Sequence, residues 1–163
     1  MTADGRAYSA LVVTVSDRAA AGVYEDKSGP TAVQLLQEMG LDAPAPVVVP
    51  DGPAVAVALR EAVAAGIDLV LTTGGTGLST RDQTPEQSRL VIEREIPGIP
   101  ELLRSKGADK VPTAILSRGI AGVAGATLII NLPGSVGGVT DGIALLKKTL
   151  FHALDQIVGG DHG

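Results

Sequence analysis

Short β-branched apolar runs recur along the first half of the chain, and each ends where polar or glycine-rich residues begin. The run at 8–15 suits a strand that is buried on both faces of a sheet, 47–49 is a short second strand, and 67–72 is the third. A polar loop over 16–29 follows the first run, and the turn Pro50-Asp51-Gly52 follows the second. The first half therefore predicts three strands with polar or glycine-rich residues at their ends.

Between the runs, apolar residues repeat every three or four positions, as on the buried face of a helix. Pro30 opens one such pattern, which ends at Gly40, and Pro53 opens a second, which ends near Gly66. Thr84 is expected to cap a third helix, with a proline at its first position and a glutamine at its third, as in a capping box. Three strand–helix units in succession predict a parallel sheet with right-handed crossovers and helices on both faces.

The second half is less regular. Its predicted elements are a kinked link (97–100), a short helix (101–106), two strands joined at Ala124-Gly125 (117–123 and 126–132), a final amphipathic helix (140–158) and a frayed end (159–163). No internal repeat or linker is visible in the sequence. We therefore expect one domain over 1–163 with a three-layer α/β/α fold, in which a mostly parallel sheet carries an irregular or antiparallel strand pair in its C-terminal half.

Composition excludes several classes of function. Hydrophobic residues make up 45% of the chain but aromatic residues only 2%, and the net charge is −5 with no basic run, which argues against nucleic-acid binding. The absence of cysteine excludes disulfides and thiolate metal sites. The first residues lack the pattern of a signal peptide, and no apolar run approaches the roughly 20 residues of a membrane span. The expectation is a soluble, cytoplasmic protein.

Acidic residues follow each of the three predicted strands. Asp17 comes directly after the first, Asp51 after the second, and Asp82 after the glycine-rich stretch that ends the third. Because ligands of open α/β sheets bind beyond the carboxyl ends of the strands, these carboxylates are expected at one edge. Each aspartate alone could be a turn former or a helix cap. Together they favour a hard cation such as Mg²⁺, which takes one or two carboxylates plus oxygens of the substrate and water.

The stretch LTTGGTGLSTRDQTPE at 71–86 is a candidate phosphate-binding loop. Gly74, Gly75 and Gly77 allow the backbone N–H groups to turn towards an anion, and threonine and serine hydroxyls surround them. The chain contains no Walker A motif, and Thr80 stands where the dinucleotide fingerprint needs its third glycine. The residues alone indicate a Mg²⁺-dependent site for a phosphorylated ligand, with a simple tight turn as the alternative.

The motifs taken together resemble one known family. TTGGTG followed by R-D-x-T-P-E resembles the molybdopterin-binding domain of the MogA/MoaB family of molybdenum-cofactor biosynthesis, and so do TVSDRAAAG with DKSGP, the PDG turn, AILSRGIAG and LIINLPGS. The resemblance implies an adenylyltransferase that joins AMP from MgATP to the terminal phosphate of molybdopterin and releases pyrophosphate. It also implies a homo-oligomer, a trimer or a hexamer, and hand-over of the product to a molybdenum insertase.

The same resemblance implies roles for individual residues. Asp51 and Asp82 match the acidic positions that the family uses for Mg²⁺ and catalysis. Arg118 is expected to contact the phosphate of the pterin, with a solvent-facing arginine at a strand end as the alternative, and His152 is expected to be structural. The residues expected to bind phosphate, pterin or nucleotide are Ser16, Asp17, Thr73, Gly74, Gly75, Thr76, Gly77, Ser117, Arg118, Pro133, Gly134 and Ser135.

The segment after LPG departs from the family pattern. It reads SVGGV at 135–139, with no positive charge until Lys147, where many members place a proline or a basic residue within a few positions. This departure leaves open a second hypothesis, a non-catalytic MoaB-type protein that binds and carries molybdopterin. A third hypothesis is a nucleotide-hydrolysing enzyme on the same fold, such as the competence-damage protein domain with pyrophosphatase activity.

Overall fold

The structure is a computed structural model that describes residues 1–160. Within this range the strands are, in chain order, β1 (Ala10–Val15), β2 (Val47–Val49), β3 (Leu69–Thr73), β4 (Arg94–Glu95), β5 (Ala121–Ala124) and β6 (Thr127–Leu132). The helices are α1 (Asp17–Ala20), α2 (Ser28–Glu38), α3 (Pro53–Ala64), α4 (Thr84–Arg89), α5 (Gly98–Gly107), α6 (Val136–Leu146), α7 (Leu150–Ile157) and the 3₁₀ helix η1 (Pro112–Leu116). No helix among these is long and apolar enough to cross a membrane.

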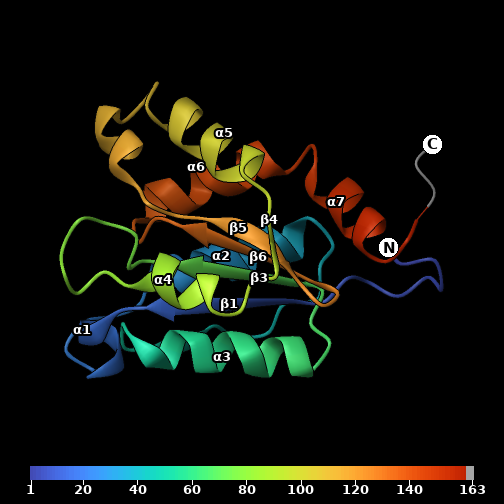
Figure 1. The fold of residues 1–163 in the computed structure, drawn as a ribbon, viewed down its shortest axis with the longest axis horizontal. Coiled ribbons are helices and arrows are strands. Elements are labelled where there is room, and N and C mark those ends of the chain that lie inside the picture. Colours follow the sequence, from blue (N-terminus) through green and yellow to red (C-terminus); the bar gives the residue numbers. More distant parts are fainter. Residues whose placement is uncertain (161–163) are drawn as a thin grey trace.

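The strands form one sheet in the order β2-β1-β3-β6-β5-β4. Figure 1 shows the sheet between α3 on one side and α5 and α6 on the other. β2, β1, β3 and β6 are parallel, and β5 and β4 are antiparallel to their neighbours. The register pairs Thr14 with Thr73 and Thr73 with Leu132, so that β1, β3 and β6 end level with one another. The prediction of a mostly parallel sheet with an antiparallel pair in the C-terminal half is confirmed, and the parallel strands carry the residues that follow them to one edge.

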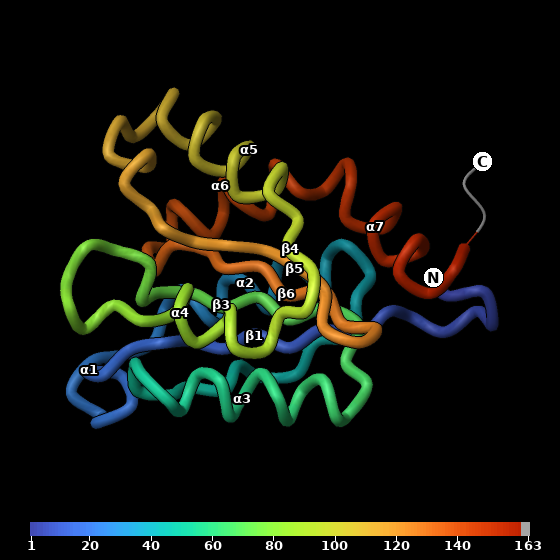
Figure 2. The backbone as a smooth tube through the Cα atoms, viewed as in Figure 1, coloured from blue at the N-terminus to red at the C-terminus, as the bar shows by residue number. Residues whose placement is uncertain are grey.

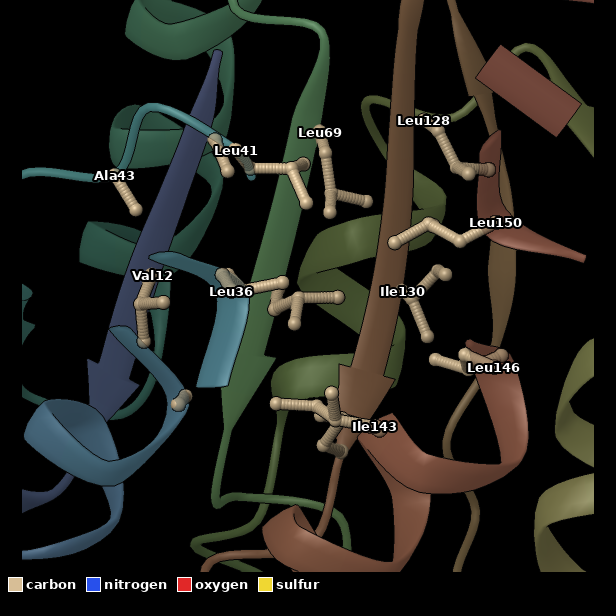
Figure 3. Close-up of a cluster of buried hydrophobic side chains, with 14 of the residues drawn as sticks. Val12, Leu36, Leu41, Ala43, Leu69, Leu128, Ile130, Ile143, Leu146 and Leu150 are labelled. Carbon is tan, nitrogen blue, oxygen red and sulfur yellow. The ribbon is translucent and has the colours of Figure 1, made fainter. Parts of the chain in front are cut away.

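Two apolar clusters join the helices to the two faces of the sheet. On one face, α3 packs through residues such as Val55 and Leu59 against Val13, Val70 and Ile129 of the strands. On the other face, α2, α6 and α7 cover a larger cluster (Figures 1 and 3). Its buried members include Val12, Leu36, Leu41, Leu69, Leu128, Ile130, Ile143, Leu146 and Leu150. These layers account for the apolar, aliphatic composition of the chain.

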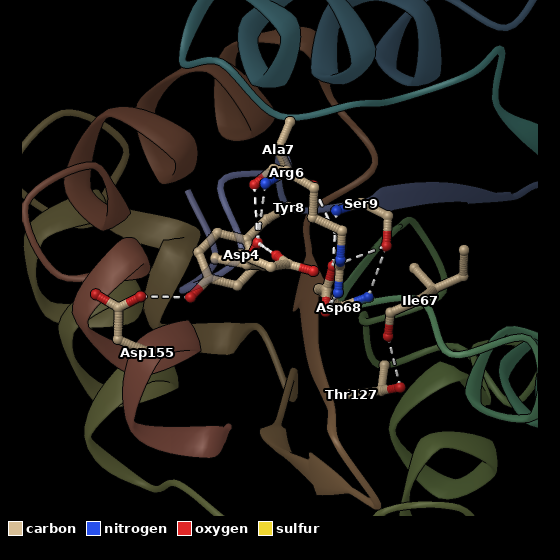
Figure 4. Close-up of polar contacts among 10 residues, drawn as sticks. Asp4, Arg6, Ala7, Tyr8, Ser9, Ile67, Asp68, Thr127 and Asp155 are labelled. Carbon is tan, nitrogen blue, oxygen red and sulfur yellow. Dashed lines mark hydrogen bonds and ion pairs between the residues drawn. The ribbon is translucent and has the colours of Figure 1, made fainter. Parts of the chain in front are cut away.

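The N-terminal segment lies beside α7 (Figure 2), and polar contacts hold it to α7 and to Asp68, the residue before β3 (Figure 4). The hydroxyl of Tyr8 donates a hydrogen bond to the Asp155 carboxylate on α7, and burial and that carboxylate raise the pKa of Tyr8 to about 12. Arg6 donates to Asp68 at 2.8 Å, and the Asp68 carboxylate also accepts from the backbone N–H and the hydroxyl of Ser9. These contacts lie at the opposite end of β1 from Ser16 and therefore belong to the scaffold.

The predicted capping box before α4 is wrong. Gln83 is the N-cap residue and Thr84 is the first residue of the helix. The Thr84 hydroxyl does not cap the helix, because it donates instead to the carbonyl oxygen of Gly74 at 2.9 Å. A tertiary partner in the loop between β3 and α4 (the glycine loop, 74–83) has replaced the local partner that the sequence pattern suggested.

The single helix predicted over 140–158 is two helices. α6 begins at Val136, because the side chain of Ser135 accepts a hydrogen bond from the N–H of Gly138 and caps the helix earlier than expected. The break falls at Thr149, whose N–H donates to the carbonyl of Leu146. Leu146 and Leu150 are both buried in the same cluster, so the chain turns without interrupting the apolar pattern.

Several other boundaries differ from the prediction. α2 begins at Ser28 and not at Pro30, the loop 16–29 contains α1, the link 97–100 is largely part of α5, and the strand expected over 117–123 begins only at Ala121, preceded by η1. The frayed end is wrong for Gly159 and Gly160, whose N–H groups donate to carbonyls of α7, while residues 161–163 lie outside the described residues.

Candidate active site

The carboxyl ends of the four parallel strands meet at one edge and carry most of the predicted site residues. Ser16 follows β1, Asp51 follows β2, Gly74 follows β3 and Pro133 follows β6. The strand order reverses between β1 and β3, because β2 lies on one side of β1 and the later strands lie on the other. Such a switch point is where ligands bind in open α/β sheets.

The glycine loop after β3 is fixed by backbone contacts that leave no room for side chains. Gly74 and Gly75 have φ values of +92° and +68°. A Cβ atom on Gly74 would lie 2.4 Å from the carbonyl oxygen of Val15, and one on Gly75 would lie 2.1 Å from the hydroxyl of Thr84. The N–H of Gly74 donates to Leu132 O at 3.1 Å, which ties the loop to β6. The loop therefore needs glycine both for its φ angles and for space.

The three predicted carboxylates lie at this edge. Oδ1 of Asp17 accepts the N–H of Asp51 at 2.9 Å, and Oδ1 of Asp51 accepts the N–H groups of Gly52 and Gln83 at 2.7 and 3.0 Å. Oδ2 of Asp51 faces the glycine loop, since it lies 2.6 Å from where a Cβ of Gly75 would be. The loop and the turn after β2 are thus in direct contact through Asp51.

Asp82 lies against the same loop, and the N–H of the next residue, Gln83, donates to Asp51. Oδ2 of Asp82 accepts the N–H of Ser79 at 3.1 Å and lies 2.8 Å from where a Cβ of Gly77 would be.

Burial raises the pKa of Asp51. Hydrogen bonds from the N–H groups of Gln83 and Gly52 oppose that rise, and the charges of Asp82 and Asp17 add to it. A cation beside Asp51 would relieve this repulsion.

The donor set fits a hard divalent cation that shares its coordination with a ligand. Within residues 1–160, no three histidine, cysteine, aspartate or glutamate side chains are grouped closely enough to hold a metal by themselves. Mg²⁺ typically takes one or two carboxylates and completes its octahedron with substrate phosphates and water. Oxygen ligands from Asp51 and Asp82 match that requirement.

Arg118 lies against the glycine loop. Its Nε donates to Gly77 O and its Nη2 to Asp82 O, both at 2.8 Å, and its Nη1 forms an ion pair with the carboxylate of Glu86 on α4. Its side chain is 35% exposed, and its guanidinium is paired with the loop and with α4. Contact with a ligand stays a prediction for this residue.

Two cavities of about 400 Å³ each lie on either side of the segment 133–135 and share Ser135 in their linings. The first is mostly apolar, is formed by α5, η1 and α6, and is lined by the predicted residues Ser117, Pro133 and Ser135. The second opens over the switch point and is lined by the predicted residues Ser16, Thr73, Gly134 and Ser135. Neither lining includes Asp51, Asp82 or the glycines of the loop.

The comparisons with known proteins decide the family. Residues 11–152 match the model of a family described as a probable molybdopterin binding domain. This chain belongs to that family. A curated molybdopterin adenylyltransferase from Pyrococcus furiosus is 38% identical over 148 residues, which cover 88% of this chain and 87% of the relative. The solved Mog protein of molybdopterin biosynthesis from Mycobacterium ulcerans is 50% identical, with a TM-score of 0.87 over 93% of this chain and 99% of that one.

A longer relative also matches this molybdopterin-binding domain. The molybdenum cofactor biosynthesis bifunctional protein of Synechococcus elongatus is 40% identical over 155 residues, which cover 94% of this chain but only 49% of the relative. The chain therefore spans about half the length of that protein. The solved structures that match include proteins titled MogA and proteins titled MoaB, so the resemblance stated from the motifs is confirmed at the level of the family.

Sequence reasoning missed several residues of this molybdopterin-binding domain that line the cavities or hold the loop. Asn131 lines the first cavity, and its side chain donates to Thr72 and Ser88 and accepts from the N–H of Ile120. A polar residue inside the otherwise apolar run TLIINL was the available signal. Asp26 lines the second cavity, where it accepts from the hydroxyl of Thr14 at 2.8 Å. It lies in DKSGP, one of the motifs that carried the resemblance.

Proposed function

We propose that this protein is a molybdopterin adenylyltransferase, which transfers AMP from MgATP to the terminal phosphate of molybdopterin and releases pyrophosphate. The observation that carries the proposal is that Asp51 and Asp82 both lie against the glycine loop, where they face Gly75 and Gly77, at the sheet edge over which the second cavity opens. Curated relatives that carry the name molybdopterin adenylyltransferase support it.

The reaction needs positioning and charge neutralisation more than covalent chemistry by the protein. An oxygen of the pterin's terminal phosphate forms a bond to the α-phosphorus of ATP. The bond from that phosphorus to the bridging oxygen of the β-phosphate breaks, and pyrophosphate leaves with the electron pair. Because the pterin phosphate is itself the nucleophile, no serine, cysteine or histidine nucleophile is required. His152, on α7, hydrogen-bonds Gln156 of the same helix and plays no part.

Asp51 and Asp82 would hold Mg²⁺, which when bound neutralises charge on the phosphates. Amides of the glycine loop bind phosphate oxygens, and Asp17 fixes the turn that carries Asp51 through its hydrogen bond to the Asp51 N–H. Asp51 and Asp82 need a bound cation between them and the substrates, because without it their negative charges would repel both ATP and the pterin phosphate.

The chemistry of the two linings separates the two substrates. We assign the nucleotide to the cavity over the switch point, which is lined by Ser16, Thr73 and Gly134. The pterin takes the larger apolar surface of the other cavity, where Ser117 and Asn131 offer polar groups to the edge of a planar ring. The terminal phosphate of the pterin then reaches the segment 133–135, which both cavities share.

The assembly and the partner are also proposals. Ala- and Val-rich helix faces are compatible with a homo-oligomer, which we propose to be a trimer or a hexamer. A relative about twice as long carries the name bifunctional, which fits hand-over of the adenylylated pterin to a molybdenum insertase.

The proposal is tested by measuring pyrophosphate release from ATP with molybdopterin and Mg²⁺, each present and absent. Wild type is expected to release pyrophosphate only when both are present, and Asp82→Ala to lose this turnover. Asp109→Ala, a change at an exposed aspartate on the C-terminal side of α5, is the matched control and keeps it. Release without molybdopterin would instead indicate the nucleotide-hydrolysing alternative.

A non-catalytic carrier remains the second candidate, because the segment after Gly134 holds no basic residue until Lys147 and because solved proteins titled MoaB also match. Under that hypothesis the wild type binds molybdopterin tightly and makes no adenylylated product. Asp82→Ala would then complement a strain that lacks the protein as well as wild type does.

A further inference from the structure

Arg118 connects the beginning of the glycine loop to its end. Its backbone N–H donates to Thr76 O at 2.9 Å, and its guanidinium donates to Gly77 O, to Asp82 O and to Glu86. The first two acceptors precede the exposed part of the loop, the third carries the candidate catalytic carboxylate, and Glu86 lies in the first turn of α4. One side chain thus bridges three places along the loop and its exit helix.

The exposed part of the loop has little else to hold it. Leu78 is 67% exposed, and the other hydrogen bonds of residues 78–82 that the structure describes stay within the segment, between Ser79, Arg81 and Asp82. Among the hydrogen bonds that the structure describes, the one from Arg118 to Asp82 O ties residues 78–82 to the rest of the domain, and the next residue, Gln83, is held separately by its N–H bond to Asp51. A loop without the bond from Arg118 could keep its local turn and still move as a unit.

The backbone on both sides of Arg118 is held by Arg104 of α5. Nη1 of Arg104, on α5, donates to the carbonyls of Ser117 and Gly119 at 3.2 and 2.8 Å, so both neighbours of Arg118 are anchored. Gly119 is buried, and a Cβ there would lie 3.3 Å from Asn131. The backbone that carries Arg118 is consequently a rigid support for the loop.

The charge of Arg118 is already paired. Its hydrogen bond to Glu86 raises the pKa of the arginine and lowers the pKa of the glutamate. An anionic ligand at this guanidinium would have to compete with that carboxylate and with two carbonyls that accept from Nε and Nη2. A planar guanidinium can bond the two carbonyls and the carboxylate at the same time, because it directs several N–H groups in fixed directions, which an ammonium group does not.

We propose that Arg118 is a positioning residue, which together with Glu86 holds Asp82 in place on the glycine loop, and that it does not contact the pterin phosphate. The inference rests on the proposed function for its kinetic consequences, but the holding of the loop is independent of turnover.

The test compares Arg118→Lys, Arg118→Met and Glu86→Gln, with kcat, the KM for molybdopterin and amide hydrogen exchange of residues 77–82 as readouts. Lysine keeps the charge but cannot reach all three acceptors, so both arginine variants should lower kcat about 10- to 100-fold with KM within about threefold of wild type. Glu86→Gln should lower kcat about 3- to 10-fold. Amide exchange in 77–82 should rise in all three variants.

Arg89→Met is the matched control, because Arg89 lies on α4 with Glu86 and forms an exposed ion pair with Glu95 at 3.4 Å. This variant should change neither kcat, nor KM, nor the exchange of 77–82.

A phosphate contact would give the opposite pattern. Arg118→Lys would then keep most of the activity, Arg118→Met would raise KM at unchanged kcat, and Glu86→Gln would lower KM by freeing the guanidinium. Any of these results overturns the inference. If wild type makes no adenylylated product, the exchange measurement still decides, since unchanged exchange of 77–82 in Arg118→Met would refute the inference without reference to catalysis.

Discussion

Gly75→Ala should show whether the glycine at this position is needed only for the stability of the loop or also for adenylyl transfer. A Cβ at this position would lie 2.1 Å from Thr84 Oγ1 and 2.6 Å from Asp51 Oδ2, and the backbone has φ +68°. The positive φ costs an alanine about 1–2 kcal/mol. Displacing two packed polar side chains costs about 1–3 kcal/mol more. The total of about 2–5 kcal/mol corresponds to a fall in Tm of roughly 4–20 °C for a domain of this size.

Gly66→Ala is the control for this prediction. Gly66 has a nearly equal φ of +74°, but a Cβ there would have no atom within 4 Å. It should therefore lose only the backbone contribution, a fall in Tm of roughly 2–8 °C, and keep full activity. Any entropy change in the unfolded chain is shared by both variants and cancels in the comparison.

The assay is thermal unfolding of both variants together with initial rates of adenylyl transfer. Because Asp51 must move to admit the new methyl group, Gly75→Ala should lower kcat about 100-fold. If Gly75→Ala unfolds at the same temperature as Gly66→Ala and retains wild-type activity, the contact between Asp51 and the loop has no role in the chemistry and the reasoning is wrong.

Three further predictions follow from single contacts. Asp51→Asn should raise Tm at neutral pH without Mg²⁺ by roughly 1–2 °C, because the pKa of Asp51 is raised above 3.8 on folding and its charged form opposes the folded state. In unfolding scans at decreasing pH the difference should shrink as Asp51 takes up its proton; a difference independent of pH would contradict this. Asp82→Asn should lower kcat on the order of 100- to 1,000-fold while molybdopterin affinity by fluorescence titration changes little, and a large loss of affinity would assign Asp82 to binding. Tyr8→Phe, which removes the hydrogen bond to Asp155, should destabilise the fold by about 1 kcal/mol in urea unfolding and leave activity unchanged, whereas a loss of activity would place this end of the sheet in the mechanism.

The parallel half of the fold could be predicted because each element depends on a local pattern. Short β-branched runs predict β1, β2 and β3, and Pro53 starts α3 at the position where a missing N–H costs nothing. The boundary between α6 and α7 could not be predicted, because the apolar repeat continues through it. It depends on a bond between Thr149 and Leu146 that forms only in the packed structure.

In the candidate site, too, the features that depend on local sequence could be predicted and those that depend on distant partners could not. The sequence places Asp17, Asp51 and Asp82 at one edge, because the ends of parallel strands meet there. It does not reveal that Arg118 turns towards the loop, since its partner Glu86 is 32 residues away and the guanidinium has several sterically equivalent directions. It misplaces the hydroxyl of Thr84 for the same reason, because the better acceptor lies on a different segment.

The most direct test of the account is mass spectrometry of the pterin recovered after the purified protein is incubated with molybdopterin, ATP and Mg²⁺. The account predicts a product that carries AMP on the terminal phosphate of the pterin, with one pyrophosphate released for each product formed, and no such product from Asp82→Ala. Recovery of unmodified molybdopterin, bound to a folded wild-type protein with ATP intact, would contradict the account and establish a carrier instead.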